Sequence, residues 1–241
     1  MPKLRVYDSQ EEAAAAAAEF ILGKLDEALQ DARRATLAVS GGSTPQLMFE
    51  ALAAQEFEWG KLQLFFVDER PVPPGHPDSN FSMADATLCQ PVGLKSKQVH
   101  RIQGELEPSV AAERYADDLV EFFQLDEGSA PRFDVLHLGM GDDGHTASLF
   151  PGEPLILDRS GLVGSVYAPG KKSYRVSLLP KVLLNAANTV FLVTGAAKAK
   201  PLKAVLEGSQ DFLAYPAQLV DRQAENVVWF LDTAAAAELA R

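Results

Sequence analysis

Short apolar runs alternate with helical patterns along almost the whole chain. The apolar runs predict strands at residues 4–7, 36–40, 62–68, 133–139, 163–168, 174–178, 189–194 and 227–231. The intervening patterns predict helices that begin at Asp8 or Ser9, at Pro45, near Asn80 and at Pro108, a short helix after His145, a helix at 197–206 and an alanine-rich terminal helix.

This alternation predicts an α/β fold with an open, mainly parallel Rossmann-like sheet and helices on both faces. Strands that helices separate pair in parallel through right-handed crossovers. No linker, charge block or internal repeat divides the sequence, so we expect residues 1–241 to form a single domain. Ligands of such sheets bind beyond the carboxyl ends of the strands. Unusual residues directly after strands are therefore the candidates for a site.

Composition narrows the class of protein. Hydrophobic residues make up 47% of the chain and charged residues 23%, which is typical of a globular protein. A single cysteine, Cys89, excludes an internal disulfide framework and a cysteine-based zinc cluster. No stretch is long and apolar enough to span a bilayer, and the first ten residues do not form a secretory signal. We therefore expect a cytoplasmic protein.

The charge balance restricts the partners. Lys and Arg total 22 against 33 Asp and Glu, so the net charge is −11. This disfavours nucleic acid and anionic membranes, because both require a basic face. A phosphorylated ligand would need a local group of cations and helix N-termini. We expect a small-molecule ligand and a monomer or small homo-oligomer.

The first segment of interest, residues 39–45, follows a predicted strand and opens a predicted helix. Gly41 and Gly42 let the backbone approach a ligand closely. Ser43 or Thr44 can cap the helix, and Pro45 suits its first turn. The segment thus predicts a phosphate cradle at a positive helix end, with a well-capped turn as the alternative. It is not a P-loop, because the Gly-Lys pair is missing.

Three charged residues, Asp68, Glu69 and Arg70, end the apolar strand at 62–68 and precede Pro71. An arginine held between a buried strand and a proline is placed to bind an anion with two hydrogen bonds. The alternative is an Arg70 that pairs with its own acidic neighbours.

Lys198 lies in the predicted first turn of the helix that follows Thr194 and Gly195. A cation there interacts unfavourably with the positive end of the helix dipole, and a bound phosphate would make its electrostatic environment favourable. A solvated lysine is the alternative. Arg175, at the start of a short β segment, is a weaker candidate for the same anion.

A glycine loop with the spacing GxGxxG, at Gly139, Gly141 and Gly144, follows another predicted strand. A dinucleotide fingerprint would need a long helix next and an acidic residue about 20 positions on. Pro151 stops any helix within two turns, and Asp158 lies in a loop-like stretch. The sequence therefore argues against dinucleotide binding.

The same loop presents Asp143 and His145. A histidine titrates near neutrality and can act as a general base toward water, and a nearby carboxylate can orient it. His137 alternates with apolar neighbours and is expected to pack inside its strand, whereas His76 and His100 are expected in loops. No set of ligands has the spacing of a metal site, so we expect no metal.

Together these segments resemble the 6-phosphogluconolactonase family of the glucosamine-6-phosphate isomerase/deaminase superfamily, which is distinct from the propeller-type lactonases. The matching residues are 40–45, 67–71, 139–152, 194–198 and Tyr215-Pro216-Ala217, in the expected order over nearly the whole chain. The run from Gly144 to Gly152, GHTASLFPG, is the most specific of them.

The resemblance implies hydrolysis of 6-phospho-D-glucono-1,5-lactone to 6-phosphogluconate in the oxidative pentose phosphate pathway, without a cofactor. It implies that His145 is the base for the attacking water and that Asp143 supports it. Ser43, Thr44, Arg70 and Lys198 would hold the phosphate. The full set of expected substrate-binding residues is Gly41, Gly42, Ser43, Thr44, Asp68, Arg70, Gly144, Arg175 and Lys198.

Two alternatives remain. In sugar-phosphate isomerases and deaminases of the superfamily, such as glucosamine-6-phosphate deaminase, the histidine loop continues toward an Asn-Glu-Pro-Gly type of ending. Here the corresponding residues are Ser148-Leu149-Phe150-Pro151, without an acid, which favours lactone hydrolysis. A non-catalytic sugar-phosphate-binding module would keep the phosphate cradle but would not require the histidine.

Overall fold

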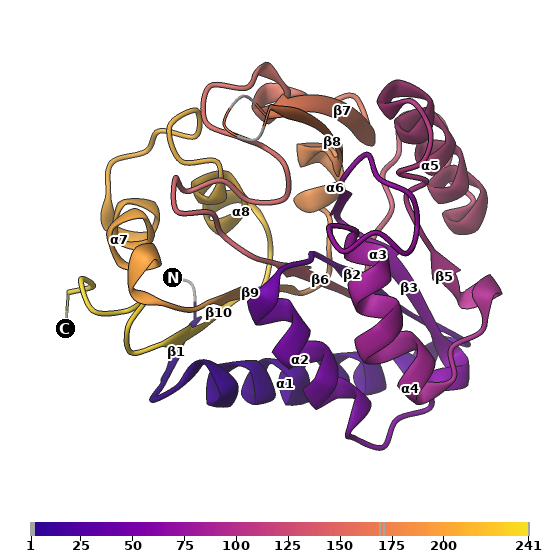
Figure 1. Ribbon diagram of the computed structural model, residues 1–241, viewed down its shortest axis with the longest axis horizontal. Coiled ribbons are helices and arrows are strands. Elements are labelled where there is room, and N and C mark those ends of the chain that lie inside the picture. Colours follow the sequence, from indigo (N-terminus) through magenta and orange to yellow (C-terminus); the bar gives the residue numbers. More distant parts are fainter. Residues whose placement is uncertain (1–2, 169, 171, 241) are drawn as a thin grey trace.

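A parallel sheet forms the centre of the protein (Figure 1). The computed structural model describes residues 3–168, 170 and 172–240, and within them seven strands pair in the order β1-β10-β9-β6-β2-β3-β5. These strands are β1 (Lys3–Tyr7), β2 (Ala35–Val39), β3 (Leu62–Phe66), β5 (Val99–His100), β6 (Val135–Leu138), β9 (Thr189–Val193) and β10 (Val227–Asp232). Every pair is parallel, which confirms the predicted fold class.

A small antiparallel sheet stands beside the main one. It consists, in the described part of the chain, of β4 (Asp68–Glu69), β7 (Val163–Ala168) and β8 (Ser173–Leu178). The prediction of one continuous strand at 62–68 is wrong, because the chain changes sheets at Val67. The Val67 N–H donates to the carbonyl of Val39, while its own carbonyl accepts from the N–H of Leu178. This change moves Asp68 and Glu69 off the main sheet.

Helices cover both faces of the main sheet. Figure 1 shows α1 and α2 on one side and α5 and α8 on the other. The described helices are α1 (Gln10–Asp31), α2 (Ser43–Ala53), α3 (Asn80–Ala84), α4 (Gln90–Val92), α5 (Pro108–Phe123), α6 (Pro180–Leu183), α7 (Ala199–Glu207) and α8 (Ala217–Gln223). Ser9 caps α1, because its hydroxyl accepts from the N–H of Glu12.

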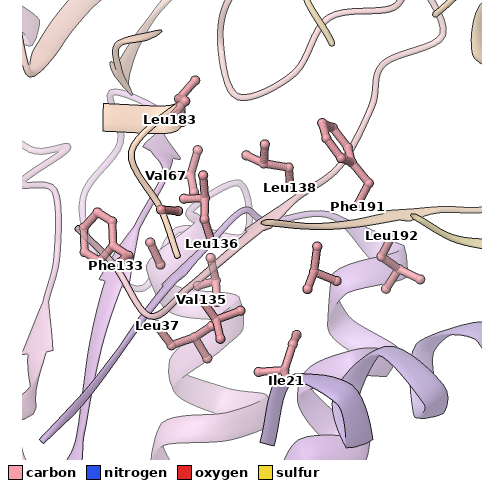
Figure 2. Close-up of a cluster of buried hydrophobic side chains, with 14 of the residues drawn as sticks. Ile21, Leu37, Val67, Phe133, Val135, Leu136, Leu138, Leu183, Phe191 and Leu192 are labelled. Carbon is pink, nitrogen blue, oxygen red and sulfur yellow. The ribbon is translucent and has the colours of Figure 1, made fainter. Parts of the chain in front are cut away.

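The core has two layers, one on each face of the sheet. Strands β2, β3, β6, β9 and β10 are buried along their whole length, as expected for parallel strands covered on both faces. Figure 2 shows Ile21 of α1 on one side of these strands and Leu183 of α6 on the other. The alanine-rich start of α1 buries its small side chains, which lets the helix lie close to the sheet.

The residues directly after His145 do not form a helix, contrary to the prediction, and the next helical turn is a 3₁₀ helix at Pro154–Leu157. Residues 146–149 form a tight turn with a bridge between Thr146 and Leu149. Ala147 adopts φ 51°, which a right-handed helix does not allow. The Thr146 hydroxyl donates to the carbonyl of Gly139, and this contact folds the loop back on itself.

The predicted terminal helix is also absent from the described residues. Residues 233–238 form turns, in which the N–H of Ala236 bonds to Asp232 and the N–H of Leu239 to Ala236. The Asp232 carboxylate accepts from the N–H of Ala235 and holds the first turn. His100 likewise differs from its predicted loop position, because it belongs to the edge strand β5.

His137 is a polar residue in an apolar site. It is fully buried on β6, which confirms that it packs within its strand, and neither ring nitrogen has a hydrogen-bond partner among the described residues. Burial disfavours the imidazolium and lowers the pKa of His137 to about 3. The native protein therefore holds this side chain neutral at a pH where the unfolded chain would protonate it.

Replacing His137 with leucine should stabilise the protein and reduce its acid sensitivity. The variant removes two unpaired buried nitrogens, and we expect a gain of about 1–3 kcal/mol in the free energy of unfolding near pH 8. Since the native pKa is depressed, the unfolded state binds more protons as the pH falls below about 6.5. Because of His137, the free energy of unfolding of the wild type should fall by about 2 kcal/mol between about pH 8 and pH 5, a loss that the leucine variant should not show. Urea unfolding of both proteins at the two pH values measures this, and equal losses would contradict it.

Candidate active site

A cavity of about 820 Å³ opens where β2, β3, β6 and β9 end. Parallel strands place the loops after them at one edge of the sheet, so segments distant in sequence meet there. The predicted site residues in its lining are Gly41, Gly42, Ser43, Thr44, Asp68, Arg70, Asp143, His145 and Lys198. Gly144 and Arg175 lie outside this lining.

His145 and Asp143 form a hydrogen-bonded pair on the loop after β6. The Nδ1 atom of His145 lies 2.6 Å from Oδ1 of Asp143, which also accepts from the backbone N–H of His145 at 3.0 Å. Burial would raise the pKa of Asp143, but the hydrogen bond from His145 and its charge outweigh burial and lower that pKa to about 2. The ionised carboxylate only accepts, so Nδ1 carries the proton and Nε2 is left to act as a base.

The imidazole fits between an aromatic ring and a glycine. The ring of Phe150 lies 4.6 Å from that of His145, centroid to centroid, at an angle of 49°. A Cβ on Gly141 would overlap Nδ1 of His145 and lie 2.5 Å from Oδ1 of Asp143. Only glycine therefore fits at position 141 while the pair keeps this geometry.

The start of α2 differs from the prediction. Gly42, at φ 127°, is the residue before the first turn, and no side chain caps the helix. Ser43 and Thr44 thus belong to the helix and line the cavity instead of capping. The hydroxyl of Thr44 lies 2.9 Å from that of Thr194, which ties this loop to the end of β9. An uncapped helix start beside a cavity suits an anion.

Two cations face the same cavity. Arg70 donates from Nη1 to the carbonyl of Asp78 at 2.6 Å, and no ion pair with a carboxylate is present for it within the described residues. Lys198 ends a 3₁₀ turn (Ala196–Lys198) that leads directly into α7, so it lies in the first turn of this helical segment, whose predicted start was residue 197. Neither cation forms an ion pair with a carboxylate of the described residues, so the charge of both is available to an anion in the cavity.

Asp68 lines the cavity, but its carboxylate is already engaged. Oδ2 accepts from the Ser148 hydroxyl at 2.6 Å, and Oδ1 lies 3.2 Å from Nδ2 of Asn80. Its neighbour Glu69 accepts from the backbone N–H groups of Asn80 and Phe81 at the start of α3. Burial raises the pKa of Glu69 in spite of these bonds. The two acids therefore join β4 to α3 and to the His145 loop.

Arg175 lies close to Arg70 without reaching the cavity wall. It is half-buried on β8, where Nη1 donates to the carbonyl of Tyr174. Burial, and then the charge of Arg70, lower the pKa of Arg175. The two guanidinium groups therefore raise the positive potential at this edge of the site.

Sequence reasoning missed several residues that shape the site. Asn80, Ser148 and Phe150 act through contacts that join distant segments, and Gly141 acts through the absence of a side chain. Of these residues, Phe150 could have been identified from the sequence, because it lies in the same conspicuous run, GHTASLFPG, as His145. Among the described residues, no group of three His, Cys, Asp or Glu side chains is arranged to hold a metal ion, and no helix is long and apolar enough to cross a membrane.

An Asp-His pair and an uncapped helix start meet at the carboxyl edge of a parallel sheet, and a family model matches most of the chain. The chain belongs to the family described as glucosamine-6-phosphate isomerases/6-phosphogluconolactonase, whose model matches residues 8–229. This confirms the resemblance found in the sequence.

Within this family, relatives that match over most of their length are named 6-phosphogluconolactonase. The chain is 40% identical over 222 residues to the 6-phosphogluconolactonase of Nostoc sp., covering 92% of this chain and 91% of that one. It is 38% identical over 240 residues to the 6-phosphogluconolactonase of Homo sapiens, covering 97% and 92%. Among solved structures, the 6-phosphogluconolactonase from Trypanosoma cruzi superposes with a TM-score of 0.89 at 25% identity, covering 100% of this chain and 98% of that one.

Gly141→Ala should displace the His145 ring while leaving the fold intact. The added Cβ overlaps Nδ1, so we expect the bond to Asp143 to lengthen by about 1 Å or more, beyond hydrogen-bond range. Gly139→Ala is the matched control on the same loop, because nothing lies within 4 Å of the position that a Cβ would take there. Crystal structures of both variants test this, and an unmoved imidazole in Gly141→Ala would refute the steric argument.

Proposed function

We propose that this chain hydrolyses 6-phospho-D-glucono-1,5-lactone to 6-phospho-D-gluconate, with His145 as the general base. The observation that carries the proposal is the oriented imidazole, held by Asp143 in the same cavity as an uncapped helix start and two cations. The relatives named 6-phosphogluconolactonase support the same reaction. We also propose that it acts in the cytoplasm.

The phosphate of the substrate binds first in this scheme. The start of α2, with Ser43 and Thr44, offers backbone N–H groups and hydroxyls, and Arg70 and Lys198 supply positive charge. Fixing the phosphate holds the far end of the sugar, so that attack at C1 becomes a positioned, nearly unimolecular event.

His145 then removes a proton from a water molecule through Nε2 as the water oxygen adds to C1. The charge that develops on the carbonyl oxygen needs hydrogen-bond donors, and we assign this role to backbone N–H groups of the two glycine loops that line the cavity. When the bond between C1 and the ring oxygen breaks, the imidazolium returns its proton to the leaving oxygen. The carboxylic acid that forms ionises and releases one proton to solution.

Acid release from freshly prepared lactone should depend on His145. We expect His145→Ala to lower kcat by at least about 100-fold, the ordinary contribution of a general base. A pH-stat assay measures the released proton, with the spontaneous opening of the lactone recorded in parallel. His76→Ala, which changes a histidine outside the cavity lining, is the control and should keep the wild-type rate. Wild-type rates in His145→Ala, or ammonia release from glucosamine 6-phosphate, would contradict the proposal.

Lys198→Ala should weaken substrate binding more than it slows the chemical step. Loss of a charge-assisted bond to phosphate should raise KM about ten-fold or more, with a smaller change in kcat. Lys200→Ala is the matched control, because Lys200 is exposed on α7 outside the cavity lining. Steady-state kinetics of the two variants test this, and equal KM values would remove Lys198 from the phosphate site.

A further inference from the structure

A buried glutamine organises the chain between α7 and α8. We call residues 208–216 the α7–α8 connection. The side chain of Gln218, in α8, donates from Nε2 to the carbonyls of Ala204 at 2.8 Å and Ser209 at 3.0 Å, and its Oε1 accepts from the N–H of Asp211 at 2.7 Å. It is fully buried. One side chain therefore binds the last turns of α7 and the beginning of the connection.

The α7–α8 connection, in turn, supports the His145 loop, residues 139–152, at two points. The N–H of Gly152 donates to the carbonyl of Leu213 at 2.8 Å, and the N–H of Ala217, just after the connection, donates to the carbonyl of Gly144 at 3.0 Å. The ring of Tyr215 covers Gly144 so closely that a Cβ there would lie 2.7 Å from Cδ1. These contacts explain the Tyr215-Pro216-Ala217 motif, which has no place in the proposed chemistry.

The opposite end of α7 carries Lys198, directly before its first residue. Figure 1 shows α7 at the edge of the fold, and α8, which contacts it, lies further in. A continuous path of contacts thus runs from Lys198 along α7, through Gln218 and the connection, to Gly144 beside His145.

We propose that Gln218 is a positioning residue that fixes the His145 loop relative to the phosphate-binding end of α7. The inference rests on the proposed function, in which His145 and Lys198 act on opposite ends of one substrate. A displacement of about 1 Å between base and anchored substrate can reduce the rate about 100-fold. Three hydrogen bonds from one buried side chain hold this spacing more rigidly than an apolar residue would.

The chain offers a matched control, Gln98. Its Nε2 donates to the carbonyls of Trp59 and Leu62, both at 2.8 Å, and its Oε1 accepts from the N–H of Lys95 at 3.2 Å. Gln98 is also buried, but it lies outside the cavity lining, and none of its side-chain hydrogen bonds goes to the His145 loop. Substituting either glutamine by leucine removes the same number of hydrogen bonds.

The experiment compares Gln218→Leu with Gln98→Leu well below their melting temperatures. We expect both variants to lose a similar amount of thermal stability, because both leave buried backbone groups unpaired. Only Gln218→Leu should lose kcat, by about ten-fold or more, with KM within about three-fold of the wild type. Unchanged kcat in Gln218→Leu, or equal loss in both variants, overturns the proposal.

Amide hydrogen exchange gives a readout that does not depend on activity. In Gln218→Leu the N–H groups of Gly152 and Ala217 should exchange at least about ten-fold faster, whereas Gln98→Leu should leave them unchanged. If exchange at Gly152 and Ala217 is faster in Gln218→Leu but the wild type does not open the lactone, the proposed function fails and the support of the His145 loop by Gln218 stands. If the wild type is active and exchange at Gly152 and Ala217 is unaffected, the positioning role fails.

If Gln218→Leu does not fold, a second pair of variants tests whether the α7–α8 connection supports the His145 loop. Tyr215→Ala removes the ring that covers Gly144 and should lower kcat about five-fold or more, while Tyr215→Phe keeps the ring and should retain the wild-type kcat. Equal kcat values for these two variants would count against support of the His145 loop by the connection.

Discussion

The parallel pairing of β2, β6 and β9 is the constraint on which the site depends. Leu37 and Ala38 of β2 pair with Val135 and Leu136 of β6, and β6 pairs in turn with β9. This register brings the loops after three strands to one edge of the sheet. A protein with a net charge of −11 can therefore present Arg70, Lys198 and the start of α2 to one small volume, although its surface as a whole repels anions.

The small antiparallel sheet adds a wall to the open cavity at this edge, because Asp68 of β4 and Ala168 of β7 belong to its lining. It draws Asp68 and Glu69 into a buried position, which is unfavourable for two carboxylates unless hydrogen bonds replace water. Ser148, Asn80 and the start of α3 supply those bonds. The bond between Ser148 and Asp68 also fastens the His145 loop to the segment that carries Arg70. The acids thus act as structural links between the His145 loop, α3 and the segment that carries Arg70.

Sequence reasoning could find what local patterns encode. The alternation of strands and helices predicts the sheet, and the glycine loop after a strand points to His145, which lines the cavity. The features that the sequence did not predict depend on contacts between residues that are distant in sequence. Ala147 takes a positive φ because Thr146 and Ser148 bond to Gly139 and Asp68, and no helical propensity in that run reveals it. The sheet change at Val67 likewise requires Leu178, far along the chain.

The glycines show how one sequence pattern can serve two purposes. In a dinucleotide site, GxGxxG lets the backbone approach a pyrophosphate. Here Gly141 leaves room for the His145 imidazole and Gly144, at φ 82°, leaves room for Tyr215. Gly41 does the same for Asn80, whose Oδ1 a Cβ would overlap. In each case the missing side chain admits a protein group and not a cofactor, so the glycine spacing reflects the packing around His145, Tyr215 and Asn80.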